Sequence, residues 1–135
     1  PQREQLEVSV ANSSSEYGIW AYGEKHFPGE VLNDIGLQRP SAQRGDFFYI
    51  ENISKERLSD LDGDVLFFVS WGREQDKETH RKLRDDPLWQ KLSVVQNNRV
   101  YFVSGYWHDS GNILAINEIL DDIEKYLVNT SSPDI

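Results

Sequence analysis

Apolar and polar residues alternate near the N-terminus in the way that strands require. In residues 6–10, apolar side chains alternate with polar ones, and this period of two predicts a strand with one buried face. The polar run at 12–15 predicts a turn, and residues 19–22 can return as a second strand. The pattern therefore predicts an antiparallel hairpin over residues 6–22.

Three further stretches predict strands. Residues 47–50 are mostly aromatic or β-branched, which favours a strand. Residues 65–69 are all apolar, as expected of a central strand that is covered on both faces. At 94–103, two valines, an Asn-Asn pair and the sequence RVYFV predict a second antiparallel hairpin.

Helix start signals precede three short apolar stripes. The predicted helices cover 27–35, 54–61 and 87–92. Pro28 and Pro87 stand where a missing N–H does no harm, and Ser54 and Asp86 are expected caps.

Two longer stretches have helical character. The polar stretch 73–84 is either a solvated helix or a surface loop. The last helix is predicted from five apolar residues at helical spacing: Ile113, Ile116, Leu120, Ile123 and Leu127.

Strands interleaved with helices predict an α/β fold, with a largely parallel mixed sheet flanked by helices and two antiparallel hairpins. In such open sheets, ligands bind beyond the carboxyl ends of the strands. This rule selects the loop after the first hairpin, the loop 38–46, Trp71 after the central strand, and residues 106–109 after the last strand.

Composition limits the possible partners. The 135 residues have the length of one domain. The chain has 14 Lys and Arg residues and 23 Asp and Glu residues, which gives a net charge of −9. This charge argues against nucleic acids and anionic membrane surfaces as partners. There is no cysteine for a disulfide or a thiolate metal site. There is also no methionine, so we expect a fragment or a processed product.

Four motifs follow one another in order: GLQRP at 36–40, ISKERL at 53–58, PLWQ at 87–90 and YWH at 106–108. Together they resemble the C-terminal lobe of the periplasmic ferric-siderophore-binding proteins of ABC importers, the receptor type for ferric hydroxamates, ferric dicitrate and cobalamin. The resemblance implies a single Rossmann-like lobe.

The resemblance also implies a domain organisation. Residues 1–135 would be the C-terminal lobe of a two-lobe receptor, with the N-terminal lobe and a signal peptide upstream. We expect residues 1–5 and 129–135 to be flexible ends. The receptor would lie in the periplasm or be lipid-anchored at the outer face of the cytoplasmic membrane.

Arginine suits an anionic chelate because its planar fork forms bidentate hydrogen bonds with carboxylate or hydroxamate oxygens. Arg39 is the first candidate for ligand binding and Arg44 the second. The alternative is that both are solvated loop arginines paired with some of the many acids.

Aromatic residues would supply the flat walls of a binding site. The candidates are Trp20, Tyr22, Trp71, Tyr106 and Trp107. Trp107 leads because it lies in a Gly-flanked loop where the resembling proteins place a tryptophan that contacts cargo, and His108 is a further candidate. Those proteins often have a tyrosine where this chain has Asp109, which leaves the chemical class of the ligand open.

Glu56 has two interpretations. Near the start of a helix, its charge stabilises the positive end of the helix dipole by about 0.3 to 1 kcal/mol. In the resembling proteins, this glutamate protrudes from the lobe and pairs with arginines of the ABC permease, and we favour this docking role.

No metal site of the protein's own is predicted. Asp60, Asp62 and Asp64 imitate the start of a calcium loop, but Val65 stands where the loop needs glycine. The three histidines have no paired ligand spacing. Ferric iron would be carried within a siderophore and held by the siderophore's own ligands.

Catalytic motifs are absent from the sequence, so the chain is expected not to be an enzyme. The favoured function is to bind a ferric siderophore, of hydroxamate or citrate type, between two lobes and deliver it to an ABC permease. The alternative is a stand-alone flavodoxin-like α/β signalling or hydrolase domain that uses Asp62 or Asp64.

Overall fold

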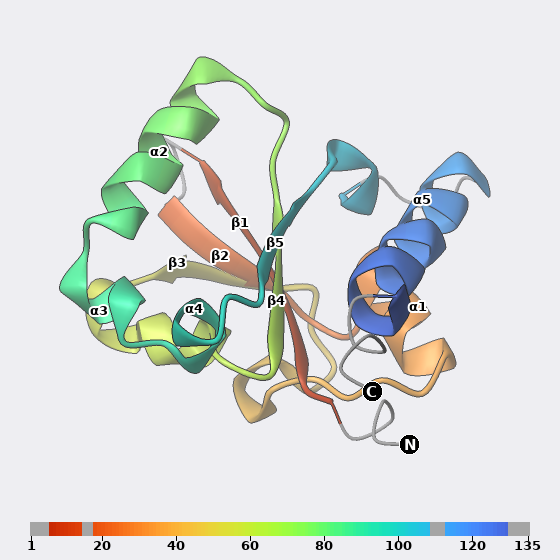
Figure 1. The fold of residues 1–135 in the computed structure, drawn as a ribbon. Coiled ribbons are helices and arrows are strands. Elements are labelled where there is room, and N and C mark those ends of the chain that lie inside the picture. Colours follow the sequence, from red (N-terminus) through yellow and green to blue (C-terminus); the bar gives the residue numbers. More distant parts are fainter. Residues whose placement is uncertain (1–5, 15–17, 109–112, 130–135) are drawn as a thin grey trace.

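The computed structural model describes residues 6–14, 18–108 and 113–129. Within these ranges the chain forms a mixed sheet of five strands. The strands are β1 (Val8–Ser14), β2 (Gly18–Tyr22), β3 (Tyr49–Ile53), β4 (Val65–Val69) and β5 (Val100–Val103). They lie in the order β3-β2-β1-β4-β5 (Figure 1). The β1–β4 and β4–β5 pairings are parallel, whereas β2 is antiparallel to β1 and to β3. The predicted α/β architecture is confirmed.

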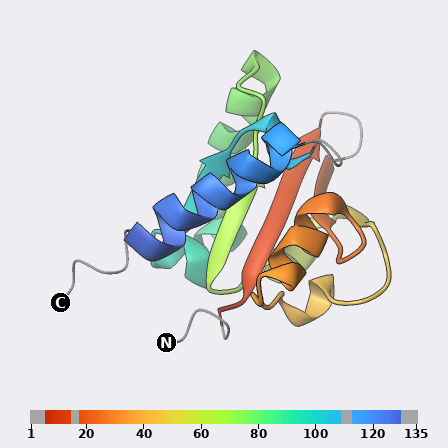
Figure 2. The same ribbon diagram turned by 90° about the vertical axis from the view of Figure 1, so that its right-hand side faces the viewer.

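Helices cover both faces of the sheet. The α-helices are α1 (Phe27–Asp34), α2 (Glu74–Arg84), α3 (Pro87–Gln90), α4 (Ser93–Gln96) and α5 (Ile113–Ile123). The shorter or irregular turns are η2 (Ser41–Gln43), η3 (Lys55–Leu61), η4 (Gly105–Trp107) and η5 (Glu124–Asn129). Helices α1 and α5 lie on one face and α2, α3 and α4 on the other, as the two views show (Figures 1 and 2).

Strand β4 supplies both cores because its side chains alternate between the two faces. Val65, Phe67 and Val69 pack with residues of α1 and α5, whereas Leu66 and Phe68 pack with residues of α2, α3 and α4. All five side chains are buried, which confirms the strand predicted from its continuous apolar run.

Several local predictions are confirmed. The first hairpin is formed by β1 and β2. Pro28 lies in the first turn of α1, and the polar stretch 73–84 forms the surface helix α2. The Asp86 carboxylate caps α3 by accepting a hydrogen bond from the backbone N–H of Leu88 at 2.9 Å.

The second predicted hairpin, over 94–103, is wrong. Ser93–Gln96 is the helical turn α4, and β5 pairs in parallel with β4. The physical reason is a cap from a distant residue: the Asp62 carboxylate accepts hydrogen bonds from the N–H groups of Ser93, at 2.9 Å, and Val94, at 3.1 Å. These bonds satisfy the start of a helix and override the strand preference of valine.

The register of the last helix is also corrected. The buried residues of α5 are Ala115, Ile119 and Ile123, whereas Ile113 and Leu120 of the predicted stripe are exposed. Small Ala115 permits close packing at a position that the apolar pattern did not select.

The predicted flexible ends, 1–5 and 129–135, lie outside the described residues except for Asn129, the last residue of η5. Among the described helices, none has the length and apolar character that crossing a membrane requires.

Candidate functional site

Six ring side chains from five separate segments contact one another and form a ring cluster: Trp20, Tyr22, His26, Tyr49, Trp71 and His108. Trp20 lies at the centre. Its ring centroid is 4.9 Å from those of Tyr22 and Tyr49 and 5.7 Å from that of His108. Trp71 joins through His108, with centroids 5.5 Å apart.

The fold explains why these rings meet. Trp20 and Tyr22 are two residues apart on β2, so they point to the same face of the sheet. Tyr49 of β3 lies opposite Tyr22 in the antiparallel register. Trp71 and His108 follow the carboxyl ends of the parallel strands β4 and β5, which meet at one edge of the sheet.

Tyr22 is the buried anchor of the cluster. Its phenol oxygen accepts a hydrogen bond from Asn12 Nδ2 at 3.2 Å and lies 2.8 Å from His108 Nδ1. Its ring stacks on His26 with centroids 4.5 Å apart. Burial raises the pKa of Tyr22 well above its ordinary value, so the phenol stays protonated at neutral pH.

His26 is held in its neutral form. Burial, assisted by the neighbouring His108, lowers the pKa of His26 to about 4. His26 Nδ1 and Trp20 Nε1 are both buried, and neither has a hydrogen-bond partner among the described residues. The deep part of the cluster is therefore uncharged.

Trp71 is held by the loops that follow β4 and β5. Its indole lies against Gly105, where an added Cβ would come within 2.1 Å of Nε1. The chain turns at Gly72, with φ of +74°. The Asp76 carboxylate then fixes the loop by accepting hydrogen bonds from the N–H groups of Trp71 and Arg73, both at 3.1 Å.

Four of the predicted site residues are thus brought together in the ring cluster: Trp20, Tyr22, Trp71 and His108. A fifth, Tyr106, is exposed on η4 in the same loop as His108. Of these five, only Tyr22 is completely buried, so it supports the other rings and cannot form a wall itself.

The prediction that Trp107 lines an open wall is wrong. Its side chain is completely buried and stacks on Phe67 with ring centroids 4.7 Å apart. The indole Nε1 donates a hydrogen bond to the Asp122 carboxylate at 2.7 Å. Polar neighbours in the sequence suggested exposure, but the helix α5–η5 supplies both apolar cover and an acceptor for the indole.

The prediction for Arg39 is also wrong, because its guanidinium is buried inside the lobe. Nε donates a hydrogen bond to the carbonyl of Val8 at 2.8 Å, and an Nη group donates to the carbonyl of Tyr22 at 2.6 Å and to the Gln43 side chain. Burial lowers the pKa of Arg39 to about 10. Arg39 therefore ties β1 and β2 to the η2 loop.

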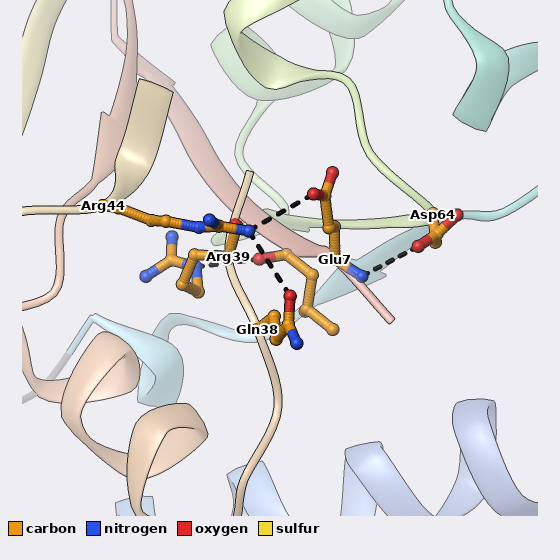
Figure 3. A network of polar contacts seen from close by, with 6 residues as sticks. Glu7, Gln38, Arg39, Arg44 and Asp64 are labelled. Carbon is orange, nitrogen blue, oxygen red and sulfur yellow. Dashed lines mark hydrogen bonds and ion pairs between the residues drawn. The ribbon is translucent and has the colours of Figure 1, made fainter. Parts of the chain in front are cut away.

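Arg44 is exposed and lies beside Glu7, the residue that precedes β1 (Figure 3). It donates to the carbonyl of Arg39 at 2.6 Å and pairs with the Glu7 carboxylate at 3.3 Å. The alternative weighed for the arginines, pairing with an acid, is what the structure shows for Arg44. Glu56 is exposed on η3, and its docking role stays a prediction.

Three residues of the site were missed from the sequence. His26 directly precedes α1, Tyr49 begins β3, and Arg73 lies with its guanidinium carbon 5.1 Å from the centroid of the Trp71 ring. The aromatic, β-prone run 47–50 was the available signal for Tyr49, and the spacing of two residues from Trp71 was the signal for Arg73; the sequence offered none for His26.

Within the described ranges, no group of three or more His, Cys, Asp or Glu side chains could hold a metal ion. A cavity of about 170 Å³ lies on the opposite face of the sheet, between α2, α3, α4 and β5, and contains none of the predicted site residues. The ring cluster is therefore the candidate site: a partly exposed aromatic surface at the edge of the sheet.

Comparison with known proteins places this arrangement in a family. Residues 1–106 match the family model of periplasmic binding proteins. The chain belongs to the periplasmic binding protein family. Similar proteins include the probable siderophore-binding lipoprotein YfiY of Bacillus subtilis (strain 168), 33% identical over 119 residues, which cover 81% of this chain and 37% of YfiY.

Two further proteins are similar to this chain. The achromobactin-binding periplasmic protein of Dickeya dadantii (strain 3937) is 33% identical over 121 residues, covering 87% of this chain and 39% of that protein. The crystal structure of Staphylococcus aureus SirA superposes with a TM-score of 0.76 at 26% identity, covering 90% of this chain and 48% of SirA. The chain therefore spans less than half the length of each of these three relatives.

Proposed function

We propose that this chain is the C-terminal lobe of a receptor that binds a ferric siderophore between two lobes and delivers it to an ABC importer. The observation that carries the proposal is the row of partly exposed rings at the edge of the sheet: Trp20, Tyr49, Trp71 and His108. Aromatic faces can bury the carbon skeleton of a chelate.

The names of the relatives support this choice of ligand. YfiY is described as siderophore-binding and the Dickeya protein as achromobactin-binding. In our proposal the siderophore provides all iron ligands, so the protein needs no metal site. The receptor works outside the cytoplasm, in the periplasm or on a lipid anchor, and it binds its cargo without transforming it.

The second lobe and the permease complete the proposed mechanism. The N-terminal lobe would close over the chelate from the opposite side, so the isolated chain binds weakly because half of the contacts are missing. Glu56 on η3 would pair with a basic residue of the permease.

The alternative of a stand-alone signalling or hydrolase domain finds no support in the acids that it requires. The Asp62 carboxylate caps α4, and the Asp64 carboxylate accepts a hydrogen bond from the N–H of Glu7 at 2.8 Å. Both precede β4 and therefore lie at its amino end, away from the ring cluster.

The binding site can be tested by NMR on the chain itself, because high-spin Fe³⁺ broadens the signals of nearby protons. The four tryptophans give four indole N–H signals. A weakly bound ferric siderophore should broaden those of Trp20 and Trp71 most, and spare that of Trp89, which packs on the opposite face. The gallium complex, which is diamagnetic, should shift the same signals without broadening them.

A panel of ferric hydroxamate and ferric citrate chelates at millimolar concentration covers the proposed ligands. Equal broadening of all four indoles would indicate random collisions. If no chelate affects Trp20 or Trp71 selectively, this surface is not the binding site and the proposal fails.

A further inference from the structure

The exposed rings continue beyond the ring cluster as an aromatic ribbon, which we define as Trp71, His108, Trp20, Tyr49 and Phe48. Successive ring centroids are 5.5, 5.7, 4.9 and 6.4 Å apart. Trp71 is 41% exposed, Tyr49 38% and Phe48 52%. Neighbouring rings meet mostly edge to face, with interplanar angles of 68°, 87°, 79° and 42°, so the ribbon presents both ring edges and ring faces to a ligand.

Each end of the aromatic ribbon carries a cation. The guanidinium carbon of Arg73 lies 5.1 Å from the centroid of the Trp71 ring, and Lys25 Nζ lies 5.4 Å from the centroid of the Phe48 ring. A cation over a ring face is held by the ring's quadrupole, so both charges are positioned at the ribbon before any ligand arrives.

The charge of Arg73 remains available to a ligand. Asp76 approaches only Nε, at 3.5 Å, and within the described residues the two Nη groups of Arg73 form no hydrogen bond. The Asp76 carboxylate is buried and already accepts the N–H groups of Trp71 and Arg73. It can therefore orient the guanidinium without facing a ligand on the ribbon.

Lys25 is the more loosely held of the two cations. Its partner Asp46 lies at 3.6 Å; the Lys25 side chain is 46% exposed and that of Asp46 89%, so the pair is weak and can open. Glu24, Glu30 and Asp34 line the same surface hollow as Lys25 and Asp46. These carboxylates compete with an anionic ligand for the ammonium group, so Lys25 is the weaker contact of the two.

We propose that the aromatic ribbon selects an anionic, carboxylate-bearing ferric chelate over a neutral or cationic one, with Arg73 as the main charged contact and Lys25 as the second. Three hydroxamates neutralise Fe³⁺, whereas citrate-type chelates have carboxylates in excess and carry net negative charge. The chain's net charge of −9 disfavours such an anion overall, so attraction must come from local cations. This inference rests on the proposed function and narrows its ligand class.

The test compares two chelates of opposite charge on the same chain: ferric citrate formed with excess citrate, and ferrioxamine B, which keeps a free ammonium group. Dissociation constants come from the broadening of the Trp20 and Trp71 indole signals. We expect Arg73→Gln to weaken ferric citrate roughly three- to tenfold, as for a lost charge-assisted hydrogen bond at an exposed site. Ferrioxamine B should bind the variant unchanged or more tightly.

Matched controls exist for both cations. Arg57 is exposed to the same 58% as Arg73 and also pairs with an aspartate three residues later, Asp60, but it lies on η3. Lys77, which pairs with Glu74, is the control for Lys25. Arg57→Gln and Lys77→Gln should leave both dissociation constants unchanged, whereas Lys25→Gln should weaken ferric citrate by a smaller factor than Arg73→Gln.

The outcomes separate the two proposals. If Arg73→Gln weakens both chelates equally, or weakens neither, the charge selection is overturned while a ferric siderophore site at the ribbon stands. If Arg57→Gln weakens ferric citrate binding as much as Arg73→Gln does, the loss of affinity comes from the change in total charge, and the charge selection is likewise overturned. If neither chelate broadens Trp20 or Trp71 in the unchanged chain, the proposed function itself fails.

Discussion

At the scale of single residues, burial separates the candidates that the sequence could not. Trp71 and Trp107 both follow a β-strand and both have glycine nearby. Trp71 is 41% exposed, with Arg73 and His108 against its ring, whereas Trp107 is covered by α5 and its indole donates a hydrogen bond to Asp122. Residue type and local spacing predicted an aromatic site, but only the tertiary contacts show which rings reach the surface.

The arginines give the same lesson. Arg39 and Arg44 were selected for the chemistry of their guanidinium groups, which is the same at Arg73. Arg39 is used instead to bind backbone carbonyls of two strands. A sequence does not reveal such use, because the acceptors are main-chain atoms 31 and 17 residues away.

His26 should make the stability of the lobe fall in acid. Its pKa is about 4 in the folded chain against an ordinary 6.5, so between these values the unfolded chain takes up a proton that the folded chain does not. Stability is therefore full above pH 6.5 and is lost as the pH falls toward 4, by up to about 3 kcal/mol. Urea unfolding at several pH values measures this loss.

The comparison variant is His26→Phe, which keeps a ring against Tyr22 and cannot titrate. The free energy of unfolding of the variant minus that of wild type cancels the contribution of the carboxylates, which both proteins share. This quantity should fall steadily as the pH rises from 4 to 6.5. His80→Phe, on the opposite face of the sheet, should reduce the pH dependence of the free energy of unfolding by less than His26→Phe does. A pH profile that His26→Phe leaves unaltered would contradict the buried neutral imidazole.

At the scale of elements, the sequence was most informative where a segment's own pattern determined its state. The run 65–69 and the capped helix starts at Pro28 and Asp86 needed no distant partner. The segment Ser93–Gln96 did need one, because the Asp62 carboxylate 31 residues earlier makes it helical. Element predictions therefore failed where a long-range hydrogen bond outweighed local preference.

Replacing Asp62 tests this account. Asp62→Ala removes the acceptor for two N–H groups at the start of α4 and should lower the free energy of unfolding by about 1 kcal/mol, the usual value of a lost N-cap. Hydrogen exchange at the amides of Ser93 and Val94 should accelerate selectively. Asp85→Ala, which removes only an exposed pair with Arg81, serves as the control and should cost less than about 0.5 kcal/mol. Unchanged exchange in Asp62→Ala would show that α4 forms without its cap.

At the scale of the whole molecule, the two proposed binding surfaces lie with different faces of the sheet. The face of α1 and α5 carries the ring cluster, and η3 with Glu56 belongs to the opposite core. Cargo binding and permease docking would then use separate surfaces of one lobe. This separation could not be predicted from the sequence, because it depends on which way each strand's side chains point.

Charge reversal at Glu56 tests the separation in a complete two-lobe receptor. Glu56→Lys should abolish most uptake of the ferric chelate by repelling the permease, while the dissociation constant for the chelate stays the same. Glu124→Lys, an equal change on exposed η5, should reduce neither. Loss of chelate binding in Glu56→Lys would show that the glutamate acts within the cargo site.

The outermost strands of the sheet have a consequence for solubility. Strand β5 has only four residues, and β3 carries an irregular register with β2, Asn52 at φ of +55° and an exposed Glu51. Short, twisted or charged border strands offer poor templates for another chain to pair with. A sheet with these borders is thereby protected against pairing with strands of other chains and against the aggregates that such pairing produces.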